Sequence, residues 1–183
     1  MTTATDLRTR KFNRFFDLLD TDGNGYIEPE DWARTAQKFS SGFGHAEGSA
    51  QAKALHQAYQ QVHHNIVSAM DTDGDGRVSR KEFRDGLHRH VADLGLLDKT
   101  FRHALDAEFD TADINGDGVL QGEEIDRIWK VWGMSAEDAK TAMEQMDRDG
   151  DGRISRDEYY ATWREYLASE DPDAPGSWLL GHP

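Results

Sequence analysis

Four segments of the sequence place oxygen-bearing side chains at one fixed spacing. Three of them, Asp71–Glu82, Asp113–Glu124 and Asp147–Glu158, have Asp or Asn at positions 1, 3 and 5, glycine at position 6 and Glu at position 12. The fourth, Asp20–Asp31, differs in that it ends on Asp. Calcium takes about six to eight oxygen ligands at roughly 2.3–2.6 Å, and glycine allows the sharp turn that folds a loop around the ion. The spacing therefore predicts four calcium-binding loops.

Each predicted loop would offer the ion both side-chain and backbone oxygens. Positions 1, 3, 5 and 12 act through side chains, position 7 through its carbonyl, and position 9 directly or through a water. The predicted ligands are Asp20, Asp22, Asn24, Tyr26, Glu28 and Asp31 in the first loop; Asp71, Asp73, Asp75, Arg77 and Glu82 in the second; Asp113, Asn115, Asp117, Val119, Gln121 and Glu124 in the third; and Asp147, Asp149, Asp151, Arg153, Ser155 and Glu158 in the fourth.

The four loops are not expected to bind equally. The second and fourth carry three Asp and one Glu, so they should chelate calcium most strongly. The third carries fewer charges, which weakens its attraction for the ion. In the first loop Asp31 is one methylene shorter than Glu and reaches the ion less easily with both oxygens. Because Mg²⁺ takes fewer ligands at about 2.0–2.1 Å, we expect Mg²⁺ to be tolerated best in this loop.

The composition narrows the classes of partner. The net charge is −14, and fifteen of the 35 acidic residues fall at predicted ligand positions. This balance argues against nucleic acid and against an anionic membrane surface, both of which need basic patches. There is no cysteine, which excludes disulfides and thiolate metal sites. Neither a signal-like segment in Met1–Phe16 nor an apolar run near 20 residues occurs. We expect a monomeric protein of the cytoplasm.

Helical periodicity on both sides of every loop indicates the elements that position the ligands. Before the first loop, Phe12, Phe15, Phe16 and Leu19 recur at spacings of three and four, which places them on one face of a helix. Comparable apolar stripes flank the other loops, and each is expected to form core. The prediction is an all-α fold of helix–loop–helix motifs, joined in two pairs and packed into one globule.

Position 8 of each loop predicts how the loops pair. Ile27, Val78, Leu120 and Ile154 occupy this position, and β-branched or apolar residues suit a short antiparallel contact. Ile27 should face Val78, and Leu120 should face Ile154. In addition, Ser79 and Ser155 each precede a Glu by three residues, which is the pattern of a capping box. We hypothesise that this Glu caps its helix without metal and turns to the ion when metal binds.

The spacing of the loops divides the chain into three parts. We expect residues 1–92 to hold the first pair of loops and residues 93–168 the second. The Gly/Ser-rich segment 40–49 lengthens the first gap and is expected to be a loop before a helix at Ala50–Met70. Residues 169–183 contain two proline-bearing breaks and then the apolar Trp178, Leu179 and Leu180. This tail is expected to pack back on the rest of the protein.

These features together resemble the calerythrin and invertebrate sarcoplasmic calcium-binding protein family, within the EF-hand superfamily. The resemblance rests on the four loops, the wide first gap, the Asp31-Trp32 pair and the Asp-Pro…Pro-Gly…Trp-Leu tail. It implies a compact, largely helical fold and a cytoplasmic role in buffering or transporting calcium. The family usually binds three ions because its second loop is often degenerate. Here Asp71–Glu82 is intact, so we expect up to four Ca²⁺.

Two other functions remain to be weighed against a buffer. A calcium sensor opens a groove on loading and binds a target protein, and such grooves are rich in methionine. This chain has five methionines, and its predicted core is Phe, Trp, Tyr and Leu. A calcium-triggered photoprotein would instead be an enzyme with an aromatic-lined cavity. No phosphate-binding glycine loop or nucleophile motif is present, so we expect no catalytic residues and no enzyme. His56, His63 and His64 are expected to be exposed helix residues rather than a metal site.

Overall fold

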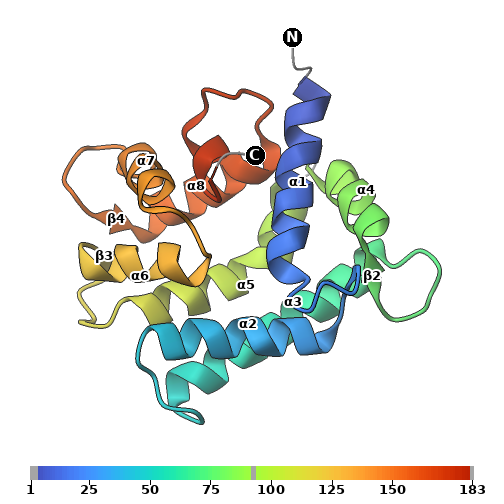
Figure 1. Ribbon diagram of the computed structural model, residues 1–183, viewed down its shortest axis with the longest axis horizontal. Coiled ribbons are helices and arrows are strands. Elements are labelled where there is room, and N and C mark those ends of the chain that lie inside the picture. Colours follow the sequence, from blue (N-terminus) through green and yellow to red (C-terminus); the bar gives the residue numbers. More distant parts are fainter. Residues whose placement is uncertain (1–3, 92–93, 182–183) are drawn as a thin grey trace.

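The computed structural model describes residues 4–91 and 94–181, within which the chain forms eight α-helices and two short antiparallel sheets (Figure 1). This confirms the predicted all-α, paired helix–loop–helix fold. In chain order the elements are α1 Ala4–Leu19, β1 Tyr26–Ile27, α2 Pro29–Gly42, α3 Ala50–Met70, β2 Val78–Ser79, α4 Arg80–His90, α5 Leu94–Ala112, β3 Val119–Leu120, α6 Glu123–Val131, α7 Ala136–Met146, β4 Ile154–Ser155, α8 Arg156–Ala168 and the 3₁₀ helix η1 Pro175–Trp178. The predicted boundary between the pairs, at 92–93, lies outside the described residues.

Local sequence signals explain where the helices begin. Both predicted capping boxes are present, with Ser79 at the start of α4 and Ser155 at the start of α8. A third capping box, which the sequence did not predict, joins Glu28 and Asp31 at the start of α2. Pro29 is the first residue of that helix, where its missing N–H has no intrahelical partner to lose. The first turn of α2 is therefore tied to the two last predicted ligands of the first loop.

The predicted loop pairing is confirmed. β1 pairs with β2 in antiparallel register, with Ile27 opposite Val78, and β3 pairs with β4, with Leu120 opposite Ile154. All four of these side chains are buried. Each pair of loops is thus held back to back by an apolar contact, which fixes the two loops of a pair relative to each other.

A single hydrophobic core joins the two halves of the chain. Phe15 of α1 lies with its ring centroid 5.6 Å from that of Phe83, 6.1 Å from Phe101 and 5.5 Å from Trp163. These partners belong to α4, α5 and α8, so one side chain contacts both pairs. The apolar stripes predicted around the loops are buried or, at Val91, Ala139 and Met143, packed against the core. Figure 1 shows α1 between α4 and α8, and the helices contact one another there.

The tail packs against the last pair of helices. η1 contacts α7 and α8, while Leu179 and Leu180 are almost fully buried. Gly176 lies so close to α8 that a Cβ there would be 2.7 Å from the carbonyl oxygen of Thr162 and from the backbone nitrogen of Tyr166. Only glycine allows this approach. The tail thereby covers the parts of α7 and α8 that η1 contacts.

A buried lysine connects the first helix to this tail. The Lys11 ammonium donates to the backbone carbonyl of Ser169 at 2.9 Å and contacts the Ser177 hydroxyl at 3.4 Å. The Tyr166 hydroxyl donates to the Lys11 carbonyl at 2.8 Å. Burial lowers the pKa of Lys11 to about 8, and the nearby Arg8 adds to the effect. The lysine therefore stabilises the junction of α1, α8 and the tail at the cost of losing its own hydration.

A buried carboxyl connects the helices α3, α5 and α8. Glu108 of α5 accepts hydrogen bonds from the hydroxyls of Tyr59 on α3, at 2.6 Å, and Tyr159 on α8, at 2.7 Å. Burial raises the pKa of Glu108 to about 7, although both hydroxyls act to lower it. Glu108 also borders a cavity of about 190 Å³ between the two pairs, which Trp32 and Trp132 help to line.

No described helix is long and apolar enough to cross a membrane.

Candidate metal centres

Three of the four predicted loops bring carboxylates together. One oxygen from each member lies within 4.8 Å of the others in the groups Asp20, Asp22 and Asp31; Asp71, Asp73 and Glu82; and Asp147, Asp149 and Glu158. These are positions 1, 3 and 12 of the first, second and fourth loops. Residues distant by eleven positions thus meet because the loop folds back on itself. A convergent set of carboxylate oxygens is the ligand type that Ca²⁺ prefers.

The position-1 aspartate organises each bend. Asp71 accepts the backbone N–H of Gly74 at 2.7 Å with one oxygen and that of Gly76 at 3.0 Å with the other. Gly76, at position 6, has φ of +80°, a conformation that a residue with a Cβ rarely adopts. The equivalent Asp113 and Asp147 make the same contacts in their loops. The glycine requirement inferred from sequence is therefore a requirement of the backbone path.

The position-12 glutamates cap a helix and face the loop at once. Glu82 accepts from the backbone and hydroxyl of Thr72, each at 2.8 Å, and from the backbone and hydroxyl of Ser79, at 3.0 and 2.7 Å. Burial alone would raise the pKa of Glu82, but these hydrogen bonds outweigh it and lower the pKa to about 2. Glu158 in the fourth loop has a lowered pKa for the same reasons. Both carboxylates are thus held ionised beside the other ligands.

The third loop differs in its ligand types. Within the described chain its carboxylates do not form a group of three at positions 1, 3 and 12, because position 3 is Asn115. Gln121, at position 9, donates its amide to Asp117 at 2.8 Å. Asp117 also accepts the backbone N–H of Val119 at 3.1 Å. The position-5 carboxylate is therefore engaged within its own loop, and Asn115 contributes no charge at position 3.

The first loop has a denser hydrogen-bond network than sequence suggested. Oδ1 of Asp31 accepts the backbone N–H of Thr21 at 3.0 Å and its hydroxyl at 2.7 Å, while Oδ2 accepts the N–H of Glu28 at 2.9 Å. The amide of Asn24 donates to the Glu28 carboxylate at 2.7 Å. Arg34, which the sequence analysis did not single out, donates to Asp31 at 2.6 Å. Burial raises the pKa of Asp31, but these bonds outweigh it and lower that pKa.

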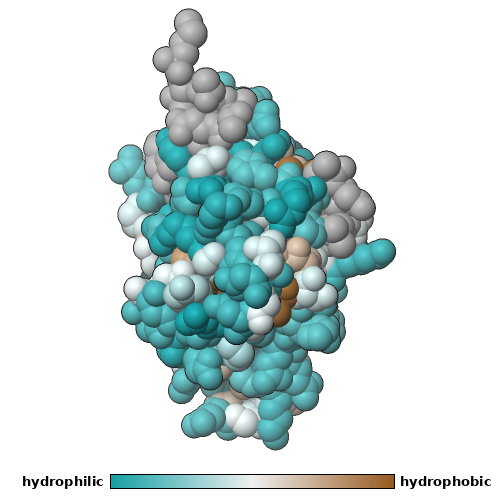
Figure 2. All heavy atoms as spheres, turned by 90° about the vertical axis from the view of Figure 1, so that its right-hand side faces the viewer, coloured by the Kyte–Doolittle hydropathy of each residue, from teal (hydrophilic) through white to brown (hydrophobic). Residues whose placement is uncertain are grey.

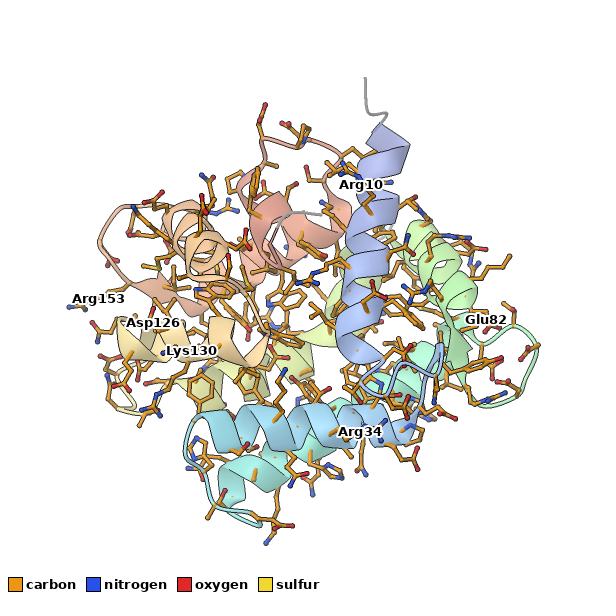
Figure 3. All side chains as sticks on the ribbon, in the orientation of Figure 1. Arg10, Arg34, Glu82, Asp126, Lys130 and Arg153 are labelled. Carbon is orange, nitrogen blue, oxygen red and sulfur yellow. The ribbon has the colours of Figure 1, made fainter. Side chains whose placement is uncertain are left out.

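The remaining predicted ligands, which would act through their backbone carbonyls, lie at the starts of the short strands. Tyr26 and Val119 are the first residues of β1 and β3, and Arg77 and Arg153 directly precede β2 and β4. The side chain of Arg77 bonds to Asp75 at 2.8 Å and lies 4.0 Å over the Tyr26 ring. Figure 3 shows the Arg153 side chain pointing away from the protein. These positions fit carbonyl ligands.

The other sequence-predicted residues lie in the same loops. Asp151, at position 5 of the fourth loop, accepts the N–H of Arg153 at 2.8 Å, and Ser155 caps α8 through Glu158. The histidines His56, His63 and His64 belong to none of the groups of metal-ligand side chains in the described chain. His56 and His63 are half-buried and only His64 is exposed, so the expectation of exposure was wrong for two of the three.

Comparisons with known proteins agree with this geometry. Residues 9–88 match the family of EF-hand domain pairs, and residues 105–129 and 139–161 match the family of EF hands. Calerythrin of Saccharopolyspora erythraea is 26% identical over 168 residues, which make up 91% of this chain and 94% of calerythrin.

Solved structures share the fold. A Streptomyces coelicolor calcium-binding protein, whose structure was described as a basis for prokaryotic calcium-mediated regulation, is 27% identical with a TM-score of 0.78; the match covers 88% of this chain and 98% of that one. A sarcoplasmic calcium-binding protein of amphioxus has a TM-score of 0.79 at 19% identity, with 97% and 98% covered. The resemblance to calerythrin and the sarcoplasmic proteins is therefore confirmed, and these relatives are not enzymes. The chain is a calcium-binding protein of the EF-hand family.

Proposed function

We propose that this protein is a cytoplasmic buffer or carrier of Ca²⁺ that works as a monomer. The observation that supports a buffer most directly is the closed form of the molecule. One aromatic core spans both pairs, and the tail covers α7 and α8. A protein built this way can take up ions in its loops without presenting a new surface. A sensor must expose apolar surface on loading.

The ions are proposed to bind through the ligand sets predicted from the sequence. The second and fourth loops supply the strongest sites, since each converges three carboxylates and has a further Asp at position 5. The third loop is a weaker site because Asn115 supplies no charge at position 3. The first loop takes a fourth ion and is the one in which Mg²⁺ competes best. Asp31, with its shorter side chain, is already bonded on both oxygens there.

The surface supports the same function. Among the described residues, Ile114 is the one large apolar side chain that is exposed, at 49%. The face in Figure 2 is mostly hydrophilic, with only small separate hydrophobic areas. Stable interaction sites more often show a contiguous apolar patch of a few hundred Å². A mainly hydrophilic surface suits a protein whose ligand is an ion.

A specific observation favours a calcium sensor as the second candidate. Between α6 and α7 lies a groove of about 760 Å³ lined by Ile125, Trp129, Met134 and Met143. The indole nitrogen of Trp129 is buried without a hydrogen-bond partner. Methionine and aromatic side chains are what adaptable target-binding grooves use. A target helix would enter there, if calcium separates α6 from α7.

The size of the cavity inside this protein does not favour the function of a calcium-triggered photoprotein. The cavity beside Glu108 measures about 190 Å³. Pockets for drug-sized organic ligands are typically about 300–1,000 Å³. The observed space is smaller than this range, and core packing accounts for the aromatic side chains around it.

Two measurements test the proposal. The first is calorimetric titration with Ca²⁺ in the presence of Mg²⁺, and the second is the fluorescence of a dye that binds exposed apolar surface, recorded during the same titration. A buffer is expected to bind several ions and to lose dye fluorescence, because loading tightens its core. A matched variant, Asp71→Asn with Asp147→Asn, should lose the two strongest sites and most of the heat. Dye uptake on loading that Trp129→Ala abolishes would instead establish the sensor. A titration that shows no heat of binding for any site would refute calcium binding altogether.

A further inference from the structure

The first loop has a cationic side chain, Arg34, beside its ligands. A single nitrogen of Arg34, Nη2, contacts Oδ2 of Asp22 at 3.0 Å and Oδ1 of Asp31 at 2.6 Å. The Nε of the same guanidinium donates to the hydroxyl of Thr21 at 2.5 Å. Asp22 and Asp31 are predicted ligands at positions 3 and 12, and both belong to the converging carboxylate group of this loop. Arg34 thus holds together two oxygens that a bound ion would also need.

The position of Arg34 follows from the local fold. Arg34 lies three residues after Asp31 on α2, near the end that follows the loop (Figure 3). Residues three apart share one face of a helix, so the guanidinium reaches back over the loop. Asp31 is almost fully buried, whereas the side chains of Arg34 and Asp22 are 42% and 44% exposed. The arginine therefore closes the loop from the solvent side.

The other three loops lack this arrangement. Within the described residues, the position-12 glutamates accept hydrogen bonds from backbone amides and from Ser or Thr hydroxyls, and from no guanidinium. The residues equivalent to Arg34 are Asp85, Arg127 and Ala161. Arg127 has the same side chain, yet it bonds to Glu123 at 2.7 Å and leaves Glu124 alone. An arginine at this position is therefore not sufficient; the shorter Asp31 and the hydroxyl of Thr21 complete the contact.

We propose that Arg34 is a built-in competitor for the metal of the first loop, which an entering ion must displace from Asp22 and Asp31. The inference rests on the proposed function, since it concerns the affinity of one of its four sites. The guanidinium neutralises carboxylates that would otherwise repel each other, so it stabilises the calcium-free loop. The same contact lowers the affinity for the ion. As the calcium concentration rises, the first loop would then be the last of the four loops to bind an ion.

The first loop offers its own optical readout. Tyr26 occupies position 7 of this loop, whereas the other loops have Arg77, Val119 and Arg153 there. Tb³⁺ replaces Ca²⁺ on oxygen ligands and emits when a nearby phenol ring transfers energy to it. The part of the Tb³⁺ emission that Tyr26→Leu removes therefore reports the first loop. Tyr26 contributes its carbonyl, so changing its side chain leaves the predicted ligand in place.

Three variants test the proposal. Arg34→Gln removes the charge, Arg34→Lys keeps the charge but loses the planar fork, and Arg127→Gln changes the equivalent residue of the third loop. We expect Arg34→Gln to tighten Tb³⁺ and Ca²⁺ binding in the first loop by about tenfold, the scale of two lost surface ion pairs. Arg34→Lys should lie between wild type and Arg34→Gln, and Arg127→Gln should leave the first loop unchanged. In chelator, Arg34→Gln should unfold at a lower temperature than wild type.

The outcomes separate this inference from the function beneath it. Unchanged or weaker first-loop binding in Arg34→Gln, with normal heats from the other loops, overturns the role of Arg34 and leaves the calcium buffer standing. Arg34→Lys behaving like wild type overturns the bridging geometry, because charge alone would then account for the effect. Absence of binding in every loop refutes the proposed function itself.

Discussion

Replacing the buried Glu108 by Gln should change how the stability of this protein depends on pH. The folded-state pKa of Glu108 is about 7, against an ordinary value of 4.5, because burial disfavours the ionised form. A carboxyl with a raised folded pKa binds more protons in the native than in the unfolded state between these two values. Its contribution to stability is therefore fully present below about pH 4.5 and is lost as the pH rises through 7.

The magnitude follows from the size of the shift. One pKa unit corresponds to about 1.4 kcal/mol, so a shift from 4.5 to about 7 is worth roughly 3 kcal/mol. Glutamine cannot ionise, but its carbonyl can still accept a hydrogen bond from Tyr59 or Tyr159. We therefore expect the free energy of unfolding of Glu108→Gln, relative to that of wild type, to increase by about 3 kcal/mol as the pH rises from 4.5 to 7.5. For a chain of this size that is about 6–12 °C in melting temperature.

The measurement is a difference of two melting curves. Wild type and Glu108→Gln are unfolded by heat in calcium-free buffer from pH 4.5 to 7.5, and the gap between their melting temperatures is plotted against pH. Loop carboxylates such as Glu82 titrate in both proteins, so their effects cancel in the gap. Glu144→Gln, at an exposed site, controls for the loss of one negative charge. A gap that stays constant over this range would refute the assignment of a neutral, buried Glu108.

Three further substitutions test the contacts that hold the tail and a helix start. Lys11→Met should cost about 1–3 kcal/mol of stability because the Ser169 carbonyl loses its donor. Because the folded-state pKa of Lys11 is lowered from 10.5 to about 8, the unfolded state binds more protons above pH 8, and the stability of wild type should rise there relative to Lys11→Met. A pH-independent difference between the denaturant midpoints of the two proteins would contradict this. Gly176→Ala should destabilise the protein by about 1–3 kcal/mol and expose the tail to limited proteolysis, because the added Cβ meets the backbone of α8; wild-type resistance to the protease would argue against the close approach. Ser79→Ala should cost about 1 kcal/mol in calcium-free protein through loss of the cap, and unchanged helicity by circular dichroism would count against it.

The loops and helices were predictable because their signals are local. Asp, Gly and Glu at fixed offsets define each loop within twelve residues, and apolar residues at spacings of three and four define each flanking helix. The pairing of Ile27 with Val78 followed from one further rule, that equivalent positions of neighbouring loops meet. In each case the information lies within a few turns of the chain or repeats at the same place in every motif.

What could not be predicted depends on residues that are distant in sequence or on choices between partners. Glu108 meets Tyr59 and Tyr159, which are 49 and 51 residues away, and no spacing rule connects them. Arg34 stands at a helical spacing from Asp31, which is a usable signal, but Arg127 stands at the same spacing and bonds elsewhere. Which of two acceptors an arginine reaches depends on side-chain length and on neighbours such as Thr21.

The contact of Lys11 with Ser169 and Ser177 has a consequence for how the protein is made. These partners lie 158 and 166 residues apart in the sequence, so the ribosome must synthesise all of the intervening residues before they can meet. Until then Lys11 lacks these two hydrogen-bond partners. Contacts of such long sequence separation form slowly. The nascent N-terminal pair should therefore stay in a loosened form, and the docking of the tail against α1 should be a late step of folding.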